Sequence, residues 1–374
     1  MHLSTLTDHR YRNNDGVTLS VLSGTHALVD AVCAALVFSL IHLYPLGPGE
    51  YLRLVIGYNL LAFALQPFCG ILVDRFFSPR AGALSGIVLS IGALAALQHQ
   101  PYITIVLSGL GNALFHVGGG AAIMKMRPDK AGPSGIFVAP GALGLATGAA
   151  IGRAGIAPVN LFFLLLTTAG LMTALCRFPV NRSTGATPFK NGTANRETVI
   201  ALLLLSVALR SLLGFSAGGL WKGHQPVILA FAFAAFCGKS AGGLLADRCG
   251  WTKTGTAALA LAALLFSRAS QAAWYAVLGI MLLQMTMPVT LTALYRTLPE
   301  RPGLAFGLCC LALVIGAAPV FSPWMSIFRN GSFIIPCALF SVTTFFAGLQ
   351  MVTGRRNAQA GESASEGTGI KLVT

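Results

Sequence analysis

Charged residues are scarce in this chain. Only 10% of its 374 residues are Asp, Glu, Lys or Arg, while 55% are hydrophobic, and the mean hydropathy is +0.74. Soluble proteins carry about 25% charged residues, which cover their water-facing surface. This composition cannot supply such a surface, so the sequence predicts a protein whose outer surface faces lipid.

Acidic residues are rarer than basic ones, with 11 against 25, and the formal net charge is +14. The connections on one side of the predicted membrane spans hold eighteen lysines and arginines, and those on the other side hold five. Basic residues near span ends resist translocation, so we expect the richer side and both termini to be cytoplasmic. Anionic lipid headgroups account for the charge. No basic face interleaved with aromatic residues points to nucleic acid as a partner.

Long polar segments are also missing. Apolar runs of about 20 residues, enough to cross a bilayer, follow one another with short connections. Because unpaired backbone groups are costly in hydrocarbon, these runs must be helices, and they lack the alternation of a membrane β-barrel. The predicted fold class is an all-α integral membrane protein with twelve transmembrane helices, near residues 18–44, 51–73, 81–98, 101–124, 133–152, 156–176, 197–219, 225–246, 254–270, 272–295, 302–325 and 333–353.

Two segments resemble each other at a spacing of nearly half the chain. GILVDRFFSPR occupies residues 70–80, and GLLADRCGWTK occupies residues 243–253, 173 positions later. Such a repeat indicates a duplicated unit. The sequence therefore predicts two pseudo-symmetric six-helix halves, joined by a polar linker and followed by a tail rich in Gly, Ser, Ala and Glu, which is typical of disorder. The expected boundaries are 1–176, 177–196 for a cytoplasmic linker, 197–354, and 355–374 for the disordered cytoplasmic tail.

The repeated segments carry charge at the ends of helices. An aspartate there can bind the positive N-terminal dipole of a neighbouring helix, while the basic residues reach headgroups or a carboxylate across the interface. Such contacts would hold one gate closed. Basic residues after a span can equally be topology anchors. The predicted gate motif consists of Gly70, Asp74, Arg75, Arg80, Gly243, Asp247, Arg248 and Lys253.

These segments resemble the signature of the major facilitator superfamily, roughly G-x-L-A-D-R-x-G-x-[KR]-[KR]. The second copy matches it well, whereas the first replaces the turn glycine with Phe77. The resemblance covers the whole pattern of spans. It implies a secondary transporter that works by alternating access, with two halves rocking about a site near the membrane midplane that is lined by helices one, four, seven and ten.

Ionisable groups inside a span are expensive and usually face a cavity or each other. Asp30 is the one acidic residue well inside an apolar run, about 18 Å past its start. His26 lies one turn earlier on the same face, and the fourth span holds His116 with Asn112 one turn before it. These groups are predicted to carry a coupling proton. Two alternatives stay open, namely hydrogen bonds between helices and coordination of sodium.

Two basic residues face this single acid. Arg210 lies in the seventh span and Lys239 in the eighth, where the repeat pairs Lys239 with Gln66. Both positions lie about 12 Å from the cytoplasmic end, which suggests a shared cavity. Gln66 is also explained by a hydrogen bond between helices. The predicted substrate-binding residues are Arg210, Lys239, Gln66, Asn112 and Gln284.

Charge counting gives the expected substrate. If Asp30 pairs with one of the two cations, one positive charge remains for an anionic ligand, and arginine suits carboxylates and phosphonates. We therefore expect a small organic anion or zwitterion. If Arg210 only braces a helix, a neutral or cationic compound becomes the alternative.

Within the superfamily, the chain is most similar to fosmidomycin-resistance-type exporters. The similarity rests on the His-x-x-x-Asp of the first helix, on GNALFH at 111–116 preceded by Gly109, and on the glycine-rich fifth helix. It implies proton-driven efflux. The fifth helix has Pro140-Gly141 followed by glycines at four-residue spacing, a departure from the usual exporter order, and this spacing also favours close helix packing.

Other functional classes find little support in the sequence. An intramembrane enzyme using His26 and Asp30 is the less favoured alternative, because no nucleophile lies with a base and an orienting group. An uptake permease for an organic acid is the closer one. We find no H-E-x-x-H or Walker motif, and so expect no metal, no cofactor and no enzyme activity. The expected partners are a small anionic substrate, protons and lipid, and the expected state is a monomer in a bacterial cytoplasmic (inner) membrane.

Overall fold

The computed structural model describes residues 2–178, 196–221, 223–322, 327 and 331–368. All regular structure among these residues is helical. The first group of elements is α1 (His2–Leu43), α2 (Pro48–Asn59), the π-helical turn η1 (Leu60–Ala64), α3 (Gln66–Phe76), α4 (Pro79–Ala96), α5 (Pro101–Met126), α6 (Ala131–Arg153) and α7 (Val159–Leu175). The second group is α8 (Arg196–Gly219), α9 (Gln225–Cys249), α10 (Trp251–Phe266), α11 (Ala273–Gln284), α12 (Met287–Thr297), α13 (Pro302–Ala317), the 3-10 turn η2 (Ala318–Phe321) and α15 (Gly331–Thr368).

Within the described residues, nine helical segments are long and apolar enough to cross a membrane, and three shorter apolar helices stand at Val159–Leu175, Trp251–Phe266 and Pro302–Ala317. Each of these segments coincides with one of the runs marked off in the sequence. The predicted all-α fold with twelve membrane helices is confirmed. The chain is a multi-pass membrane protein.

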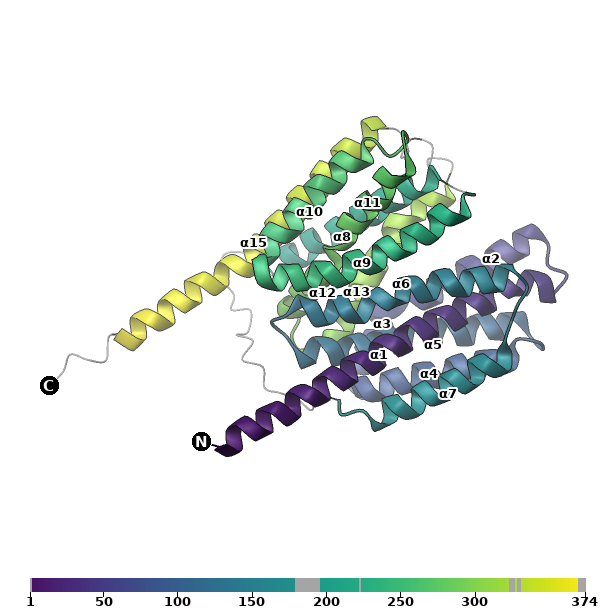
Figure 1. The fold of residues 1–374 in the computed structure, drawn as a ribbon, viewed down its shortest axis with the longest axis horizontal. Coiled ribbons are helices and arrows are strands. Elements are labelled where there is room, and N and C mark those ends of the chain that lie inside the picture. Colours follow the sequence, from purple (N-terminus) through teal and green to yellow (C-terminus); the bar gives the residue numbers. More distant parts are fainter. Residues whose placement is uncertain (1, 179–195, 222, 323–326, 328–330, 369–374) are drawn as a thin grey trace.

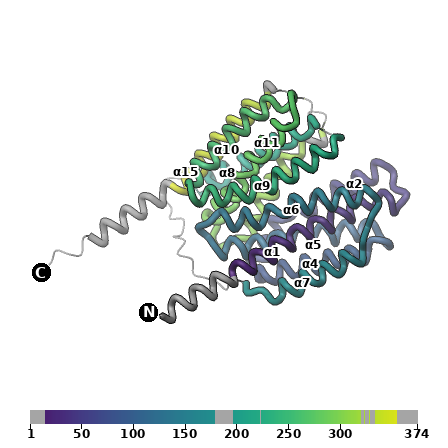
Figure 2. Tube along the Cα trace, in the orientation of Figure 1, coloured from purple at the N-terminus to yellow at the C-terminus, as the bar shows by residue number. Residues whose placement is uncertain are grey.

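The helices form two bundles (Figure 1), α1–α7 in purple to teal and α8–α15 in green to yellow. Figure 2 traces the same arrangement along the Cα atoms. Residues 179–195 of the predicted linker lie outside the described part of the chain. The first residues of the predicted tail, 355–368, continue α15 as helix. The exact domain boundaries stay predictions.

Two of the spans are broken by proline. In the second, the π-helical turn η1 precedes Gln66-Pro67, and in the tenth, α11 ends before α12 restarts at Met287-Pro288. Proline lacks an N–H, and its ring clashes with the carbonyl four residues earlier, so the chain must open or interrupt the regular ladder there. Each break lies within an apolar span, next to residues predicted from the sequence to bind substrate.

The glycines of the fifth span bring α6 against α1. A Cβ atom built at three of these glycines would collide with backbone of α1, because the helices touch through their main chains. The pairs are Gly144 with Ala27, Gly148 with Ala31, and Gly152 with Ala35. The close-packing interpretation of this four-residue spacing is therefore confirmed. The contact fixes the face of α1 that carries His26 and Asp30.

Gly144→Ala is expected to destabilise the protein by about 1–3 kcal/mol, because the new methyl group overlaps the Ala27 carbonyl and forces α1 and α6 apart. The measurement is the thermal unfolding midpoint of the purified protein in detergent. The matched control is Gly214→Ala in the interior of α8, where an added Cβ meets no atom within 4 Å. That control should be neutral or slightly stabilising. Equal midpoints for the two variants would contradict the packing.

The two bundles meet through glycine contacts that repeat with the duplication. A Cβ at Gly135 of α6 would strike the Lys239 carbonyl of α9, and a Cβ at Gly307 of α13 would strike the backbone of Gln66. The two glycines are 172 positions apart. The close approaches therefore occur in matching pairs, α6 with α9 and α13 with α3, at the two positions that the sequence repeat aligns.

Candidate functional site

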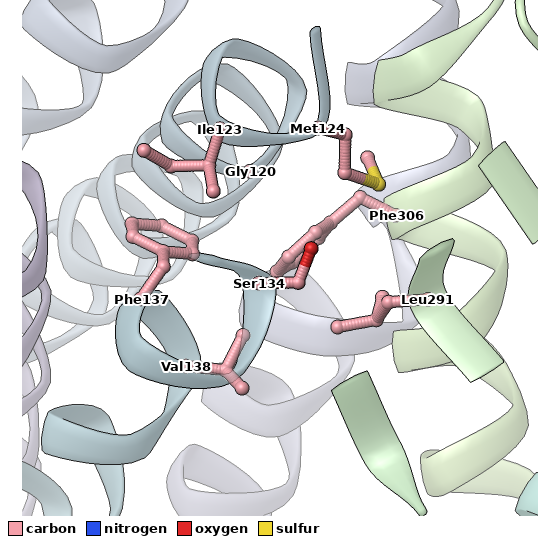
Figure 3. A pocket seen from close by; sticks show the side chains of 8 residues that line it. All are labelled: Gly120, Ile123, Met124, Ser134, Phe137, Val138, Leu291 and Phe306. Carbon is pink, nitrogen blue, oxygen red and sulfur yellow. The ribbon is translucent and has the colours of Figure 1, made fainter. Parts of the chain in front are cut away.

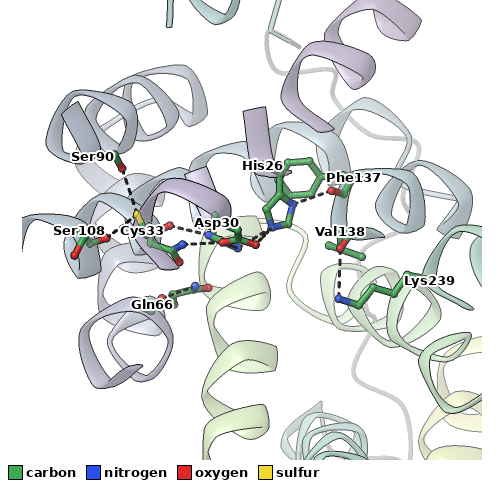
Figure 4. Close-up of polar contacts among 12 residues, drawn as sticks. His26, Asp30, Cys33, Gln66, Ser90, Ser108, Phe137, Val138 and Lys239 are labelled. Carbon is green, nitrogen blue, oxygen red and sulfur yellow. Dashed lines mark hydrogen bonds and ion pairs between the residues drawn. The ribbon is translucent and has the colours of Figure 1, made fainter. Parts of the chain in front are cut away.

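Three ionisable side chains meet in the interior of the first bundle. His26 and Asp30 project from successive turns of α1 (Figure 4), and His116 comes from α5. The Nε2 atoms of the two histidines are 2.8 Å apart. Asp30 Oδ2 is 3.3 Å from His26 Nε2, and its Oδ1 is 3.6 Å from His116 Nε2. We call these residues the triad. Its members are 4%, 6% and 4% exposed, so the grouping expected from the sequence is present and buried.

The outer nitrogen of each histidine is held by a backbone carbonyl. His26 Nδ1 lies 2.7 Å from the Phe137 oxygen of α6, and His116 Nδ1 lies 2.8 Å from the Asn112 oxygen one turn earlier in α5. A carbonyl oxygen only accepts hydrogen bonds, so both Nδ1 atoms must donate and carry a proton. This fixes both rings with Nε2 directed at the centre of the triad.

The remaining neighbours of Asp30 are an amide and a glycine. Asn112 Nδ2 donates to Asp30 Oδ1 at 2.8 Å. A Cβ atom at Gly141 would lie 2.5 Å from His26 Nε2 and 2.6 Å from Asp30 Oδ2. Only a glycine in α6 leaves room for the triad in this arrangement. Asn112 was expected beside Asp30 from its spacing, whereas the contact with Gly141 could not be read from the sequence.

Lys239 approaches this region from the second bundle. Its Nζ atom donates to the Val138 carbonyl at 3.4 Å (Figure 4). Val138 directly follows Phe137, whose carbonyl binds His26. Two successive carbonyls of α6 thus connect the triad of one half with the cation of the other. Among the described residues, no carboxylate forms an ion pair with Lys239.

Arg210 makes its contacts within the second bundle. Its guanidinium donates to the Thr286 hydroxyl, to the Thr290 hydroxyl at 2.9 Å and to the Ser206 carbonyl at 3.1 Å. It also lies over the Phe345 ring, 5.5 Å from the centroid. The side chain is 3% exposed. Hydroxyls satisfy its donors but do not neutralise its charge, and no ion pair to it is found in the described part of the chain.

Gln66 and Gln284 occupy different surroundings. Gln66 is fully buried, and its Nε2 donates to the Ala62 carbonyl within its own span, while no group in the described part of the chain donates to its Oε1. Gln284 ends α11 beside Gly238 of α9, and it is half-buried. The structure therefore brings His26, Asp30, His116 and Asn112 into one cluster, with Lys239 at its edge.

The two motif aspartates bind helix N-termini across the interface, as the sequence predicts. Asp247 of α9 accepts from the backbone N–H groups of Ala131 and Gly132 at 2.8 Å each, where α6 begins. Asp74 of α3 accepts from those of Gly303 and Leu304 at 2.9 Å each, in the first turn of α13. Each carboxylate satisfies two donors that a helix start leaves unpaired. We call this end of the bundles, where both chain termini also lie, the aspartate end (Figure 1).

The other motif residues behave differently from the aspartates. Gly70 and Gly243 allow backbone contact with Gly303 and with Ala131–Gly132. Gly250 adopts φ +97°, which favours glycine, whereas Phe77 in the first copy is extended at φ −122°. The two loops therefore differ, as the missing glycine predicts. The basic motif residues are all exposed, and among the described residues none forms an ion pair: Arg75, Arg80, Arg248 and Lys253.

The sequence did not predict two groups of side chains that join the bundles at or near the aspartate end. Trp251 donates to Asp247 at 3.1 Å, and Arg296 lies 3.9 Å over its ring while pairing with Asp129 at 2.9 Å. Deeper in, Phe306 of α13 packs against Gly120 of α5. Around Phe306 the side chains leave no space large enough for a water molecule (Figure 3), and they include Ile123, Met124, Ser134, Phe137, Val138 and Leu291. We call this cluster the plug. It separates the triad from the aspartate end.

Comparisons with known proteins place the fold. No protein-family model matches the chain, and no curated protein matches it in sequence. Solved structures do match. FucP, the E. coli fucose:proton symporter, was solved in an outward conformation and aligns with a TM-score of 0.67 at 12% identity, over 92% of this chain and 99% of its own. The chain has the major facilitator fold.

Two further solved structures with this fold are similar to this chain. The human organic anion transporter MFSD10 aligns with a TM-score of 0.63 at 13% identity, covering 90% of this chain and 99% of that one. A bacterial homologue of the iron transporter ferroportin, in an outward-facing state, aligns with a TM-score of 0.57 at 16% identity, covering 90% and 98%. At these identities the similarity establishes the major facilitator fold and supports no subfamily within it.

Proposed function

We propose that this protein is a secondary active transporter that moves a small organic anion or zwitterion by alternating access, coupled to protons and in the direction of efflux. The observation that carries the proposal is the matched pair of aspartate contacts. Asp74 and Asp247 close one end of the two bundles in the same way, and a buried ionisable triad lies behind that closure. A transporter needs a pseudo-symmetric gate to open and close access to a central site, whereas a receptor or a scaffold does not.

In this mechanism the aspartate end is the cytoplasmic gate. Breaking the carboxylate contacts frees α6 and α13 to swing away from α9 and α3, and withdrawal of Phe306 from Gly120 opens the plug. The triad would then face the cytoplasm. A rocking motion about matched interfaces is the usual form of alternating access in folds built from repeats. We propose the bacterial cytoplasmic membrane as the location, and a monomer as the working unit.

The triad is proposed to carry the coupling proton, with Asp30 as its acceptor and His26 and His116 as its partners. Both rings present Nε2 to the carboxylate, so one proton can be shared among three groups without a change of rotamer. FucP is a proton symporter, and that coupling is brought here as part of the proposal. Sodium is the alternative ion, and a proton-selective dye response to substrate would separate the two.

The substrate is proposed to be anionic because, among the described residues deep inside the spans, two cations, the buried Arg210 and the half-buried Lys239, outnumber one carboxylate, the buried Asp30. Lys239 lies at the edge of the triad, where its partner among the described residues is a carbonyl, and Arg210 donates to two hydroxyls. We assign Lys239 as the first anion contact, and keep Arg210, Gln66, Asn112 and Gln284 as proposed contacts and orienting groups. MFSD10 is an organic anion transporter, which supports this class. The likeness of the first and fourth spans to fosmidomycin-resistance-type exporters supports efflux.

A thermal-shift panel tests the substrate class. We expect small carboxylates and phosphonates to raise the unfolding midpoint of the purified protein, and cations and neutral amphiphiles to leave it unchanged, since only anions offset a buried cation. Lys239→Ala should lose the response, and Lys239→Arg should keep it. The control Arg268→Ala removes an exposed cation between α10 and α11 and should respond like the wild type. Stabilisation by cations alone would overturn the anion assignment.

The alternative functions make different predictions. An uptake permease for an organic acid would use the same residues with the opposite direction of net flux, which the sign of the imposed proton gradient distinguishes. An intramembrane enzyme using His26 and Asp30 would turn over its substrate in detergent without any gradient. A secondary transporter cannot do so, and we expect no turnover.

A further inference from the structure

The triad has the composition of a metal site. Searches for local sequence motifs miss it because two ligands come from α1 and the third from α5, 86 residues after Asp30. In the structure, one ligand atom from each residue lies within 4.8 Å of the others, and all three residues are buried. Two imidazoles and one carboxylate form a donor set that divalent first-row transition metals prefer, whereas Mg²⁺ and Ca²⁺ prefer oxygen ligands.

The hydrogen bonds of the histidines point to a cation between them. Both Nδ1 atoms donate to backbone carbonyls, at 2.7 Å for His26 and 2.8 Å for His116. A neutral imidazole carries one proton, so each neutral ring then presents a lone pair at Nε2. These two lone pairs face each other at 2.8 Å, beside a carboxylate. A positive ion must lie between them, and the candidates are a shared proton and a metal.

The distances are close to those of a metal site. Ligand atoms bound to a tetrahedral zinc at about 2.0 Å lie about 3.3 Å from one another. His26 Nε2 lies 3.3 Å from Asp30 Oδ2, and His116 Nε2 lies 3.6 Å from Asp30 Oδ1, so the carboxylate would bind the metal through both oxygens or turn to present one of them. The Nε2 atoms would have to separate from 2.8 Å by about 0.5 Å. Gly141 packs directly against two of the ligand atoms, so no side chain fills the place beside them.

The hydrogen bonds to the three candidate ligands also resemble those of known metal sites. Histidine ligands of metals usually donate their second ring nitrogen to a carbonyl or carboxylate, and ligating carboxylates are themselves hydrogen-bonded. Here Phe137 and Asn112 supply the two carbonyls, and the Asn112 side chain donates to Asp30 at 2.8 Å. All of these partners are held by helix backbone in α5 and α6, which fixes the direction of each lone pair.

We propose that His26, Asp30 and His116 bind one divalent transition-metal ion of the zinc class, in the position that a shared proton takes in its absence. Lys239 binds the carbonyl next to the one that holds His26, and its positive charge opposes the metal, so removal of that charge should tighten binding several-fold. Binding itself is independent of the proposed substrate. Competition between the metal and the coupling proton, and hence inhibition of transport by zinc, rests on the proposed function.

The experiment measures metal bound to the full chain in detergent, purified through a tag that contains no histidine. After equilibrium dialysis against Zn²⁺, elemental analysis is expected to find about one zinc per chain in the wild type and none in His26→Ala or His116→Ala. His42→Ala is the matched control, since His42 also lies on α1 but contacts the Arg153 carbonyl at its far end. Asn112→Leu should bind about 10–100-fold more weakly. Co²⁺ should give the visible bands of a tetrahedral site, and Mg²⁺ should not compete.

Each outcome of the zinc-binding measurement either supports or overturns the proposed metal site. Zinc that is absent from the wild type, or that persists in both triad histidine variants, overturns the proposal. Should those variants unfold, His116→Gln and the loss of the Co²⁺ bands in Asp30→Asn make the same test with smaller changes in volume. Stoichiometric zinc together with no transport of any anion would leave the metal site standing and overturn the proposed function. Transport of an anion without zinc binding would support the proposed function and overturn the metal site.

Discussion

Asp30→Asn is expected to reduce gradient-driven accumulation to the level of protein-free vesicles. Asparagine keeps the size of the side chain and can still accept from Asn112, so the fold of α1 against α5 and α6 should persist. It removes the one carboxylate that both histidines face. Without this charge the two histidines lose the carboxylate that favours a bound proton, and the gradient loses its main point of action on the protein.

The measurement is accumulation of the anion that the thermal-shift panel identifies, in proteoliposomes with an imposed pH gradient, together with proton uptake followed by a dye. Exchange of substrate at equilibrium, which needs no gradient, should survive. Glu50→Gln, at a half-buried carboxylate that accepts from the Tyr102 hydroxyl, serves as the control and should transport normally. Undiminished accumulation with proton uptake in Asp30→Asn would remove Asp30 from the mechanism.

Asp247→Ala is expected to open the aspartate end. The change leaves two backbone N–H groups of α6 and the Trp251 indole without their carboxylate. Charge-assisted hydrogen bonds contribute about 1.5–3 kcal/mol each. A net loss of about 3 kcal/mol would shift the equilibrium between closed and open states by about 100-fold. Asp74→Ala should act in the same direction through α13, and the double variant should exceed either one.

Labelling by a maleimide reads this opening without any substrate. Met124→Cys, in a background free of other cysteines, places the thiol in the plug, where it is buried in the closed state. We expect slow labelling with Asp247 present, intermediate labelling in Asp247→Asn, which keeps one acceptor, and fast labelling in Asp247→Ala. Arg75→Ala should have little effect, because Arg75 is exposed and pairs with no described carboxylate. Equal labelling rates across the series would refute the gate.

The candidate site could be predicted from the sequence only where spacing along one helix decides contact. His26 and Asp30 lie four residues apart, so any helix places them together, and Asn112 and His116 follow the same rule. That α1 and α5 would bring the two pairs within hydrogen-bond distance depends on how the helices pack, and Gly141 and Gly144 of α6 contact only the α1 side of this cluster. The roles of Phe137 and Val138 are invisible in the sequence, because their contacts use backbone carbonyls and not side chains.

The contacts of Arg210 and Lys239 likewise could not be predicted from spacing along one helix. The sequence places both cations at depth in neighbouring spans, but not the direction in which either side chain points. Lys239 reaches Val138 across the interface, while Arg210 turns toward Thr286 and Thr290 inside its own bundle. Rotation of a helix about its axis is set by the neighbours it packs against, and no local pattern encodes it.

The sequence by itself determined the solvent, the helices and the duplication. Hydropathy decides which residues must leave water, hydrocarbon forces those residues into helices, and the repeated Gly-x-x-x-Asp-Arg spacing identifies equivalent ends in the two halves. Only the tertiary structure decided which groups meet. The aspartates needed particular helix starts as partners, the plug needed Phe306 to enter the other bundle, and the triad needed three lone pairs directed at one point. Contacts of this kind depend on distance and direction in space, and these are fixed only when the bundles pack.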